Sequence, residues 1–153
     1  MKDFQIVPFN NKYSNAFLEL NKTWIEEYWS LEKADLIDLQ NPQKAILEKG
    51  GEIFFLIYNQ KAIGTAAIIP FNYNKVELAK MTIQKNFRGK GLSKILLEHC
   101  INYAKKNQIN EIFLISNSQL IVAKRLYKKF GFKETSLDFN KYKRGNYKMV
   151  LTL

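Results

Sequence analysis

A glycine-rich loop between a strand-like run and a helical pattern constrains this chain more than any other feature. The loop reads Arg88-Gly89-Lys90-Gly91-Leu92-Ser93 and follows an apolar run at 76–83. The apolar residues behind it recur at helical spacing, at Leu96, Leu97, Cys100, Ile101 and Ala104. A strand that passes through glycines directly into a helix is a building unit of α/β folds.

The rest of the sequence continues this alternation. Strands are predicted at 4–8, 53–58, 62–69, 76–83, 112–115, 132–137 and 146–153. Helices are predicted around Phe17–Tyr28, from Pro42 to Gly50-Gly51, behind the loop, and from Leu120 to a cap at Gly131. The order is β-α-α-β-β-β-α-β-α-β-β, a mixed sheet flanked by helices. A length of 153 residues predicts a single domain, 1–153.

The loop has the chemistry of a phosphate site. Glycines let the backbone approach a ligand closely, and the unpaired N–H groups of the first helical turn attract an anion. Arg88, Lys90 and Lys94 add positive charge. Two known phosphate loops are excluded by spacing, because Gly91 breaks a Walker A pattern and Lys94 stands where a Rossmann loop needs its third glycine.

The loop resembles the acetyl-CoA motif of the GNAT superfamily of N-acetyltransferases, Arg/Gln-x-x-Gly-x-Gly/Ala. Arg88 and Gly91 fill its first and fourth places, and Ser93 replaces the usual small residue at the sixth. A second family signature, Ala-x-x-x-Tyr followed by Gly-Phe, appears at Ala123, Tyr127, Gly131 and Phe132. The family asparagine that often precedes it is replaced by Leu120, and Asn117 is the alternative for its role.

This resemblance implies a GNAT-like α/β fold and direct transfer of an acetyl group from acetyl-CoA to a primary amine of an unidentified acceptor. The coenzyme is expected to bind the strand backbone at Met81, Thr82 and Ile83, the loop residues, Asn117 and Tyr127. The loop residues are Arg88, Gly89, Lys90, Gly91, Leu92 and Ser93.

Two residues are candidates for acid–base catalysis. Tyr127 matches the family tyrosine that protonates the coenzyme sulfur, and the alternative is a core aromatic residue. Strict strand alternation puts Glu77 on one face with Ala79, Met81 and Ile83. A local bulge, which the resemblance makes common in this strand, is the alternative and would reverse the alternation. A carboxylate on an apolar face is a candidate general base; the alternative is an edge carboxylate paired with a lysine such as Lys80.

The first helical segment carries aromatic residues. Trp24, Tyr28 and Trp29 are the candidates for walls of an acceptor pocket, with a core role as the alternative. His99 lies off the apolar stripe of its helix and is expected on a flank. Cys100 lies on the stripe, so we expect a buried, inert thiol.

The net charge of +10 leaves two further functions open. Only three of the 24 basic residues are arginine, which argues against recognition of base sequence. The stretch 141–148, KYKRGNYK, is either a nucleic-acid-binding surface or a solvated turn. A non-catalytic acyl-CoA-binding regulator is the other alternative.

The charge is also polarised along the chain. Residues 16–40 carry a net −4 and residues 84–133 a net +9. The positive segment suits a polyphosphate coenzyme, and the negative one a cationic, amine-bearing acceptor.

Cysteine and histidine spacing predicts no metal site, and no long apolar run predicts a signal peptide or membrane helix. We therefore expect a cytoplasmic protein that acts on a small-molecule or peptide amine, with a homodimer as an option.

Overall fold

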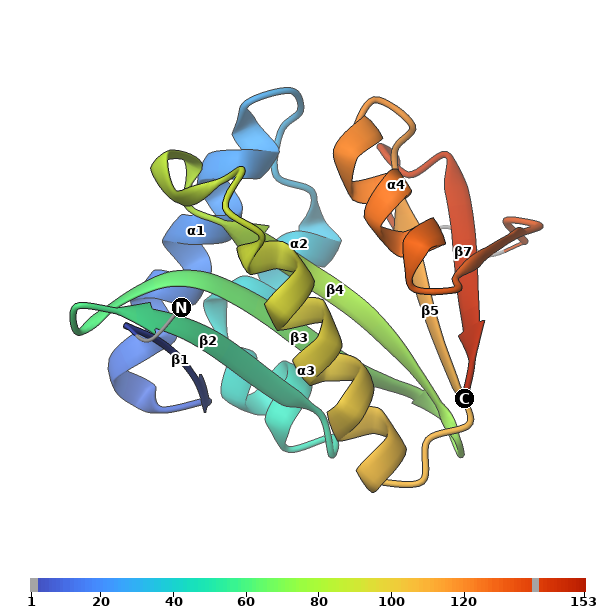
Figure 1. Ribbon diagram of the computed structural model, residues 1–153, viewed down its shortest axis with the longest axis horizontal. Helices are drawn as coiled ribbons and strands as arrows, with labels where there is room; N and C mark the ends of the chain where they lie inside the picture. Colours follow the sequence, from blue (N-terminus) through green and yellow to red (C-terminus); the bar gives the residue numbers. More distant parts are fainter. Residues whose placement is uncertain (1–2, 139–140) are drawn as a thin grey trace.

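The computed structural model describes residues 3–138 and 141–153. Its seven strands form one sheet in the order β1-β2-β3-β4-β5-β7-β6 (Figure 1). The strands are β1 (Phe4–Pro8), β2 (Glu52–Tyr58), β3 (Lys61–Asn72), β4 (Lys75–Ile83), β5 (Glu111–Ser116), β6 (Lys133–Thr135) and β7 (Tyr147–Thr152). Neighbouring strands are antiparallel except β4 and β5, which run parallel. The predicted mixed sheet and the predicted order of elements are confirmed.

Helices cover both faces of this sheet (Figure 1). The helical elements are α1 (Ser14–Glu26), α2 (Lys33–Gln40), α3 (Leu92–Lys106) and α4 (Ile121–Lys129), with short turns η1 (Asn11–Tyr13), η2 (Gln43–Leu47) and η3 (Lys85–Phe87). One core cluster joins the sheet to α3 and α4, and a second joins the opposite face to α1, α2 and η2. The two cores follow from the strand period of two, as in β2, where Phe54 and Leu56 belong to one and Phe55 to the other.

The second predicted helix is placed wrongly. The sequence predicts it from Pro42 onward, whereas α2 ends at Gln40 and η2 is a five-residue π-helix that stops at Leu47. Proline disfavours a helical conformation in the residue before it, and Asn41 has φ −142° and ψ 68°. The helical pattern is therefore split into two short segments.

A bulge in β4 re-aims the side chains that follow it. Lys80 has a left-handed backbone (φ 56°), and the register with β3 slips at this point. Ala79 packs in the cluster under α1 and α2, but Met81 and Ile83 belong to the cluster under α3 and α4. The prediction that Glu77, Ala79, Met81 and Ile83 share one face is therefore wrong, because the extra residue reverses the alternation.

Strands β4 and β5 separate soon after they begin. Within the described part of the chain they pair only from Lys75↔Glu111 to Glu77↔Phe113. Beyond this point the two strands diverge, and α4 follows β5 on the far side of the gap (Figure 1). The splay leaves the β5-facing edge of residues 78–83 of β4 without a strand partner. The candidate active site lies along this edge.

Candidate active site

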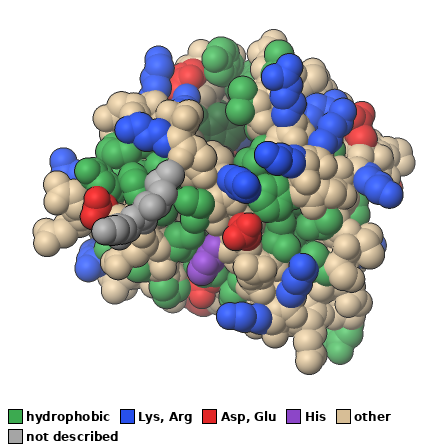
Figure 2. Space-filling model, viewed as in Figure 1, with side chains coloured by type: hydrophobic (Ala, Val, Ile, Leu, Met, Phe, Trp, Pro, Cys, Tyr) green, Lys and Arg blue, Asp and Glu red, His purple; other side chains and the backbone are tan. Residues whose placement is uncertain are grey.

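A cleft of about 570 Å³ lies where β4 and β5 diverge. Figure 2 shows a hollow in the upper part of this face, with Lys and Arg side chains around it. Its lining includes Met81, Thr82 and Ile83 from β4, Arg88, Gly89 and Ser93 from the loop, Ala123, Leu126 and Tyr127 from α4, and Trp24, Glu27 and Tyr28 from α1 and its end. Seven of the residues predicted to bind the coenzyme therefore meet in one cleft.

The loop at 88–93 has the backbone that its glycines suggest. Gly89 and Gly91 both have φ +79°, and a Cβ built on either meets no atom within 4 Å. Glycine is needed here for its backbone conformation and not for lack of space. Gly91 caps α3, so the free N–H groups of the first helical turn lie beside the cleft.

Arg88 is held in place from two sides. Its Nε donates to the carbonyl oxygen of Ile83 at 2.9 Å, and its guanidinium lies 3.4 Å from the carboxylate of Glu27. The side chain of Arg88 remains 39% exposed. A partly exposed guanidinium at the mouth of a cleft can receive an anionic group.

Four other predicted coenzyme contacts lie differently. Lys90 is exposed with its ammonium 5.7 Å from the ring centre of Phe87, and the side chain of Leu92 is buried in the core. Gly91 lies at the helix cap and not among the residues that line the cleft. The side-chain amide of Asn117 is hydrogen-bonded within the protein. Its nitrogen donates to the carbonyl of Arg144 at 2.7 Å, and its oxygen accepts from the N–H of Gln119.

Tyr127 belongs both to the core and to the wall of the cleft. Its side chain packs beside Phe132, with the ring centres 5.8 Å apart. Burial raises the pKa of the Tyr127 phenol, so the hydroxyl stays protonated at neutral pH. A neutral phenol on a cleft wall can donate a proton or a hydrogen bond.

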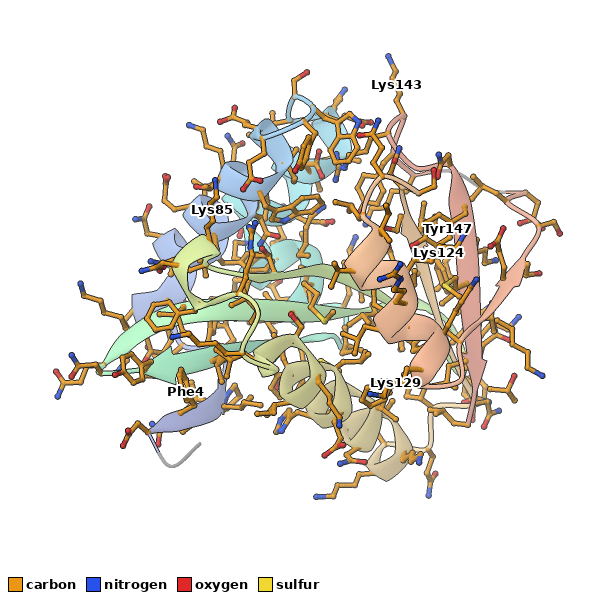
Figure 3. All side chains as sticks on the ribbon, turned by 45° about the horizontal axis from the view of Figure 1, so that its top comes forward. Phe4, Lys85, Lys124, Lys129, Lys143 and Tyr147 are labelled. Carbon is orange, nitrogen blue, oxygen red and sulfur yellow. The ribbon has the colours of Figure 1, made fainter. Side chains whose placement is uncertain are left out.

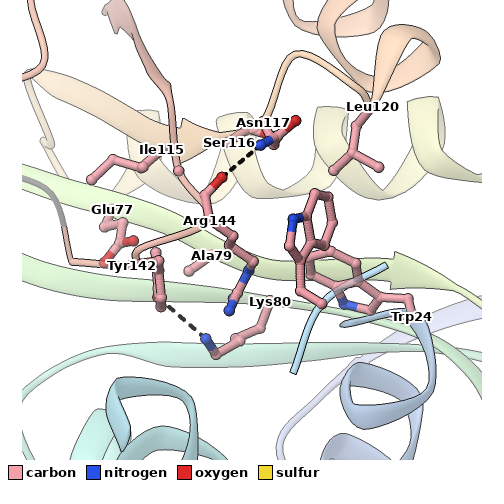
Figure 4. Close-up of a pocket in the computed structure, with 12 residues that line it drawn as sticks. Trp24, Glu77, Ala79, Lys80, Ile115, Ser116, Asn117, Leu120, Tyr142 and Arg144 are labelled. Carbon is pink, nitrogen blue, oxygen red and sulfur yellow. Dashed lines mark hydrogen bonds between the residues drawn. The ribbon is translucent and has the colours of Figure 1, made fainter. Parts of the chain in front are cut away.

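A smaller pocket of about 50 Å³ adjoins the cleft on the α1 and α2 side (Figure 4). The smaller pocket and the cleft are continuous, because six residues line both: Trp24, Ala79, Lys80, Ile115, Ser116 and Leu120. The smaller pocket also contains Trp29, Glu77, Asn117, Tyr142, Arg144 and Gly145. Trp24 and Trp29 pack edge to face with ring centres 6.4 Å apart, and Tyr28 is 62% exposed at the rim.

Glu77 is buried in this pocket, with 5% of its surface exposed. Its Oε1 accepts from the ammonium of Lys141 at 3.3 Å, and the same ammonium donates to Asp38 at 3.0 Å. Burial raises the pKa of Glu77, while the ammonium groups of Lys141 and Lys80 oppose that rise. The lysine that pairs with Glu77 is thus Lys141, whereas Lys80, the example that the sequence suggested, pairs elsewhere.

Lys80 pairs with Asp35, which is fully buried. The Lys80 ammonium donates to Asp35 at 2.8 Å and to the hydroxyl of Tyr142 at 3.2 Å (Figure 4). Arg144 approaches Asp35 from the other side with two contacts of 2.7 Å. Burial alone would raise the pKa of Asp35, but the hydrogen bond from Arg144 and the charge of Lys80 hold it well below its ordinary value.

We call residues 141–145 the strap, because they cross from β7 to α2. The carboxylate of Glu32 accepts from the backbone N–H groups of Lys143 and Arg144 at 2.7 and 3.2 Å. Tyr142 is buried, and only the side chain of Lys143 projects outward (Figure 3). Two of the basic side chains in 141–148, Lys141 and Arg144, are therefore bound to acids of the chain and not presented to solvent as a free turn.

The acids of residues 16–40 do not all form the acidic surface that was expected to receive the acceptor. Glu32, Asp35 and Asp38, which supply half of the acids in residues 16–40, are bound by Lys80, Lys141 and Arg144. The sequence offered one signal for this cluster. The three acids are spaced by three residues, which puts them along one side of a helix. Their partners come from distant segments and had no local signal.

Two other predictions concern α3. His99 lies half-buried on the flank with its ring against Phe54, the centroids 4.5 Å apart. Cys100 is fully buried, and burial raises the pKa of its thiol to about 12. A thiol in this state is a poor nucleophile at neutral pH.

Within 3–138 and 141–153 no helix is long and apolar enough to cross a bilayer, and no group of three metal-ligating side chains forms.

The sequence model of the acetyltransferase (GNAT) family matches residues 14–132. The chain belongs to this family. A GNAT acetyltransferase from Staphylococcus aureus superimposes with a TM-score of 0.87 at 25% identity, over 97% of this chain and 98% of the other. An acetyltransferase from Streptococcus agalactiae has the same TM-score at 21% identity over the full length of both, which shows the shared GNAT fold.

Curated relatives of this GNAT chain include an N-acetylaspartate synthetase and an N-acetyltransferase. N-acetylaspartate synthetase of Xenopus tropicalis is 30% identical over 109 residues, which cover 70% of this chain and 40% of the relative. Human N-acetyltransferase 8B is 24% identical over 108 residues, which cover 67% and 48%. The chain thus spans less than half the length of either relative.

Proposed function

We propose that this chain transfers the acetyl group of acetyl-CoA directly to a primary amine. The observation that carries the proposal is the junction of the two spaces at Ala79 and Lys80. The larger cleft has the loop and the open strand edge that a phosphorylated, extended donor needs. The smaller pocket holds a buried carboxylate, Glu77, for an amine.

The residues of the cleft suit the donor. Arg88 and the N–H groups beside Gly91 are suited to bind an anion, and the unpaired edge of β4 offers backbone groups to an extended chain. An extended donor would pair with this edge as an added strand does. The neutral phenol of Tyr127 supplies a proton at the cleft wall.

Two residues account for the proton transfers of the reaction, Glu77 as the base and Tyr127 as the acid. Glu77 accepts a proton from the acceptor amine, whose nitrogen forms a bond to the acetyl carbon as the carbon–sulfur bond breaks. Tyr127 donates its proton to the departing thiolate and regains one from solvent. Direct transfer agrees with the buried state of Cys100, which rules that thiol out as an acetyl carrier in the folded protein.

The acceptor belongs to the amines that GNAT enzymes acetylate, such as amino acids or peptides. The relative in Xenopus tropicalis is named for the synthesis of N-acetylaspartate, which supports including small amino acids among the candidates. A pocket of about 50 Å³ in the free chain suits the end of an amine and not a bulky group.

The test combines binding and turnover. We expect isothermal titration to show acetyl-CoA binding, and a thiol-release assay over a panel of amino acids, peptides and polyamines to show CoA production with at least one amine. Binding without turnover across the panel would instead support a non-catalytic regulator. Absence of binding would contradict the proposal.

A further inference from the structure

Two carboxylates share one ammonium group at the back of the smaller pocket. Lys141 lies between Asp38 on α2, at 3.0 Å, and Glu77 on β4, at 3.3 Å. The two carboxylates are 7% exposed as side chains and Lys141 is 21% exposed. Poor access to water makes both the attraction and the repulsion in this trio strong.

The trio is distinct from the neighbouring charge cluster. Glu32 and Asp35 carry two negative charges that Arg144 and Lys80 balance. Asp38 and Glu77 also carry two, but Lys141 alone pairs with them among the described residues. The trio therefore holds one negative charge in excess when both acids are ionised.

Among the described residues, the charged and titratable groups near Glu77 come from α2, β4 and the strap. Asp38 lies on α2, Lys80 on β4, and Lys141 and Tyr142 on the strap, while Arg144 of the strap lines the same pocket. Glu77 is paired with Ile69 on β3 and Phe113 on β5, which are uncharged. The balance between Asp38 and Lys141 is thus the local means of controlling the charge on Glu77.

We propose that Lys141 is a positioning residue for Glu77, anchored by Asp38, which holds Glu77 as a carboxylate with one oxygen fixed. The inference rests on the proposed role of Glu77 as the base. With Oε1 engaged by Lys141, Oε2 is the oxygen that takes the proton of the acceptor amine. The strap then does more than close the pocket, because it delivers the group that keeps the base ionised.

The proposal predicts opposite effects for the two partners of Glu77. Lys141→Met removes an attractive ammonium, so the acid limb of the kcat/KM profile moves to higher pH by about one unit. On that limb the rate falls about tenfold. Asp38→Asn removes a repulsive carboxylate but keeps an amide oxygen that can accept from Lys141, so the limb moves to lower pH. Lys141→Arg restores the wild-type profile, because the positive charge is kept.

Lys143→Met is the matched control. It changes the same residue type on the same strap, but the Lys143 side chain is exposed and points away from the pocket (Figure 3). We expect its pH profile to match the wild type. The affinity for acetyl-CoA is expected to stay unchanged in all four variants, since none of these residues lines the larger cleft.

A second readout does not depend on turnover. Carbon-13 NMR of the Glu77 carboxyl, assigned by its loss in Glu77→Gln, follows its titration in the free protein. Opposite shifts in Lys141→Met and Asp38→Asn support the proposal; no shift, or shifts in one direction, overturn it. If Lys141→Met does not fold, Asp38→Asn decides alone: a Glu77 titration moved to lower pH supports the proposal, and no shift or a shift to higher pH overturns it. Lack of CoA release by the wild type would contradict the proposed function instead, while the titration would still decide the coupling.

Discussion

The guanidinium of Arg144 and the carboxylate of Asp35 form a bidentate ion pair across 109 residues of chain, with both contacts at 2.7 Å. The pair fastens the strap to α2 inside the protein. The Arg144 guanidinium also lies over the rings of Tyr142 and Trp24, 4.6 and 5.6 Å from their centres. One side chain thereby joins the strap, α1 and α2 into the wall of the smaller pocket.

Loss of this pair is expected to destabilise the fold. Arg144→Met leaves Asp35 buried with Lys80 as its remaining cation, and breaking a buried pair costs about 3 kcal/mol or more. Denaturant unfolding measures the change. Arg125→Met is the control, because Arg125 is exposed on α4 and its loss is expected to cost no more than about 0.5 kcal/mol. Equal costs for both variants would show that the pair contributes no stability.

Asp35 also makes stability depend on acidity. Its pKa is held below the ordinary 3.8 in the folded protein, so the unfolded chain binds its proton first as the pH falls. The contribution of Asp35 is therefore complete above that ordinary value and is lost as the pH falls below it. We expect the difference in unfolding free energy between wild type and Asp35→Asn to shrink progressively as the pH falls from about 4 toward the lower pKa that Asp35 has in the folded protein. A difference that stays constant would argue against this assignment.

Removal of one hydroxyl tests the proposed acid. Tyr127→Phe keeps the ring in the core, so the fold and acetyl-CoA binding are expected to persist. The turnover number is expected to fall about 100-fold, because the thiolate loses its proton donor. Stopped-flow thiol release and calorimetry measure the two quantities. Tyr73→Phe, at a 91% exposed tyrosine, is expected to match the wild type; an equally active Tyr127→Phe would leave Tyr127 with a packing role alone.

The ion pair of Arg88 and Glu27 is expected to oppose coenzyme binding. Glu27→Gln frees the guanidinium, so acetyl-CoA should bind up to about fivefold more tightly, the range of an exposed pair. Arg88→Gln should bind more weakly. Calorimetry at low and high salt measures both, and the gain in Glu27→Gln should decrease with salt. Glu26→Gln changes the exposed neighbour and should leave the affinity unaltered. Weaker binding by Glu27→Gln would contradict the expectation.

Much of the larger cleft was predictable because its signals are local. The glycines of the loop set backbone conformations within a few residues, and the spacing of Ala123 and Tyr127 puts both on one face of a single helix. The strand face of Glu77 was harder. The bulge at Lys80 places a lysine in a left-handed conformation, which no residue preference predicts.

The pocket on the other side depends on contacts across the chain. Lys141, Arg144 and Tyr142 read as a basic turn, because their partners stand 62 to 109 residues earlier. Hydrophobic periodicity carries no information on which buried acid a distant cation will meet. Only the packed sheet brings the two together.

The glycine loop at 88–93 is thus the part of the site that the sequence determined by itself. Its glycines, its position between a strand and a helix, and the order of the elements around it follow from local backbone preferences and side-chain periodicity. The tertiary structure decided the splay of β4 from β5, the reversal of faces at Lys80, and the inward course of the strap. The last two bury charges from separate segments, whose desolvation is offset only when the whole fold pairs them.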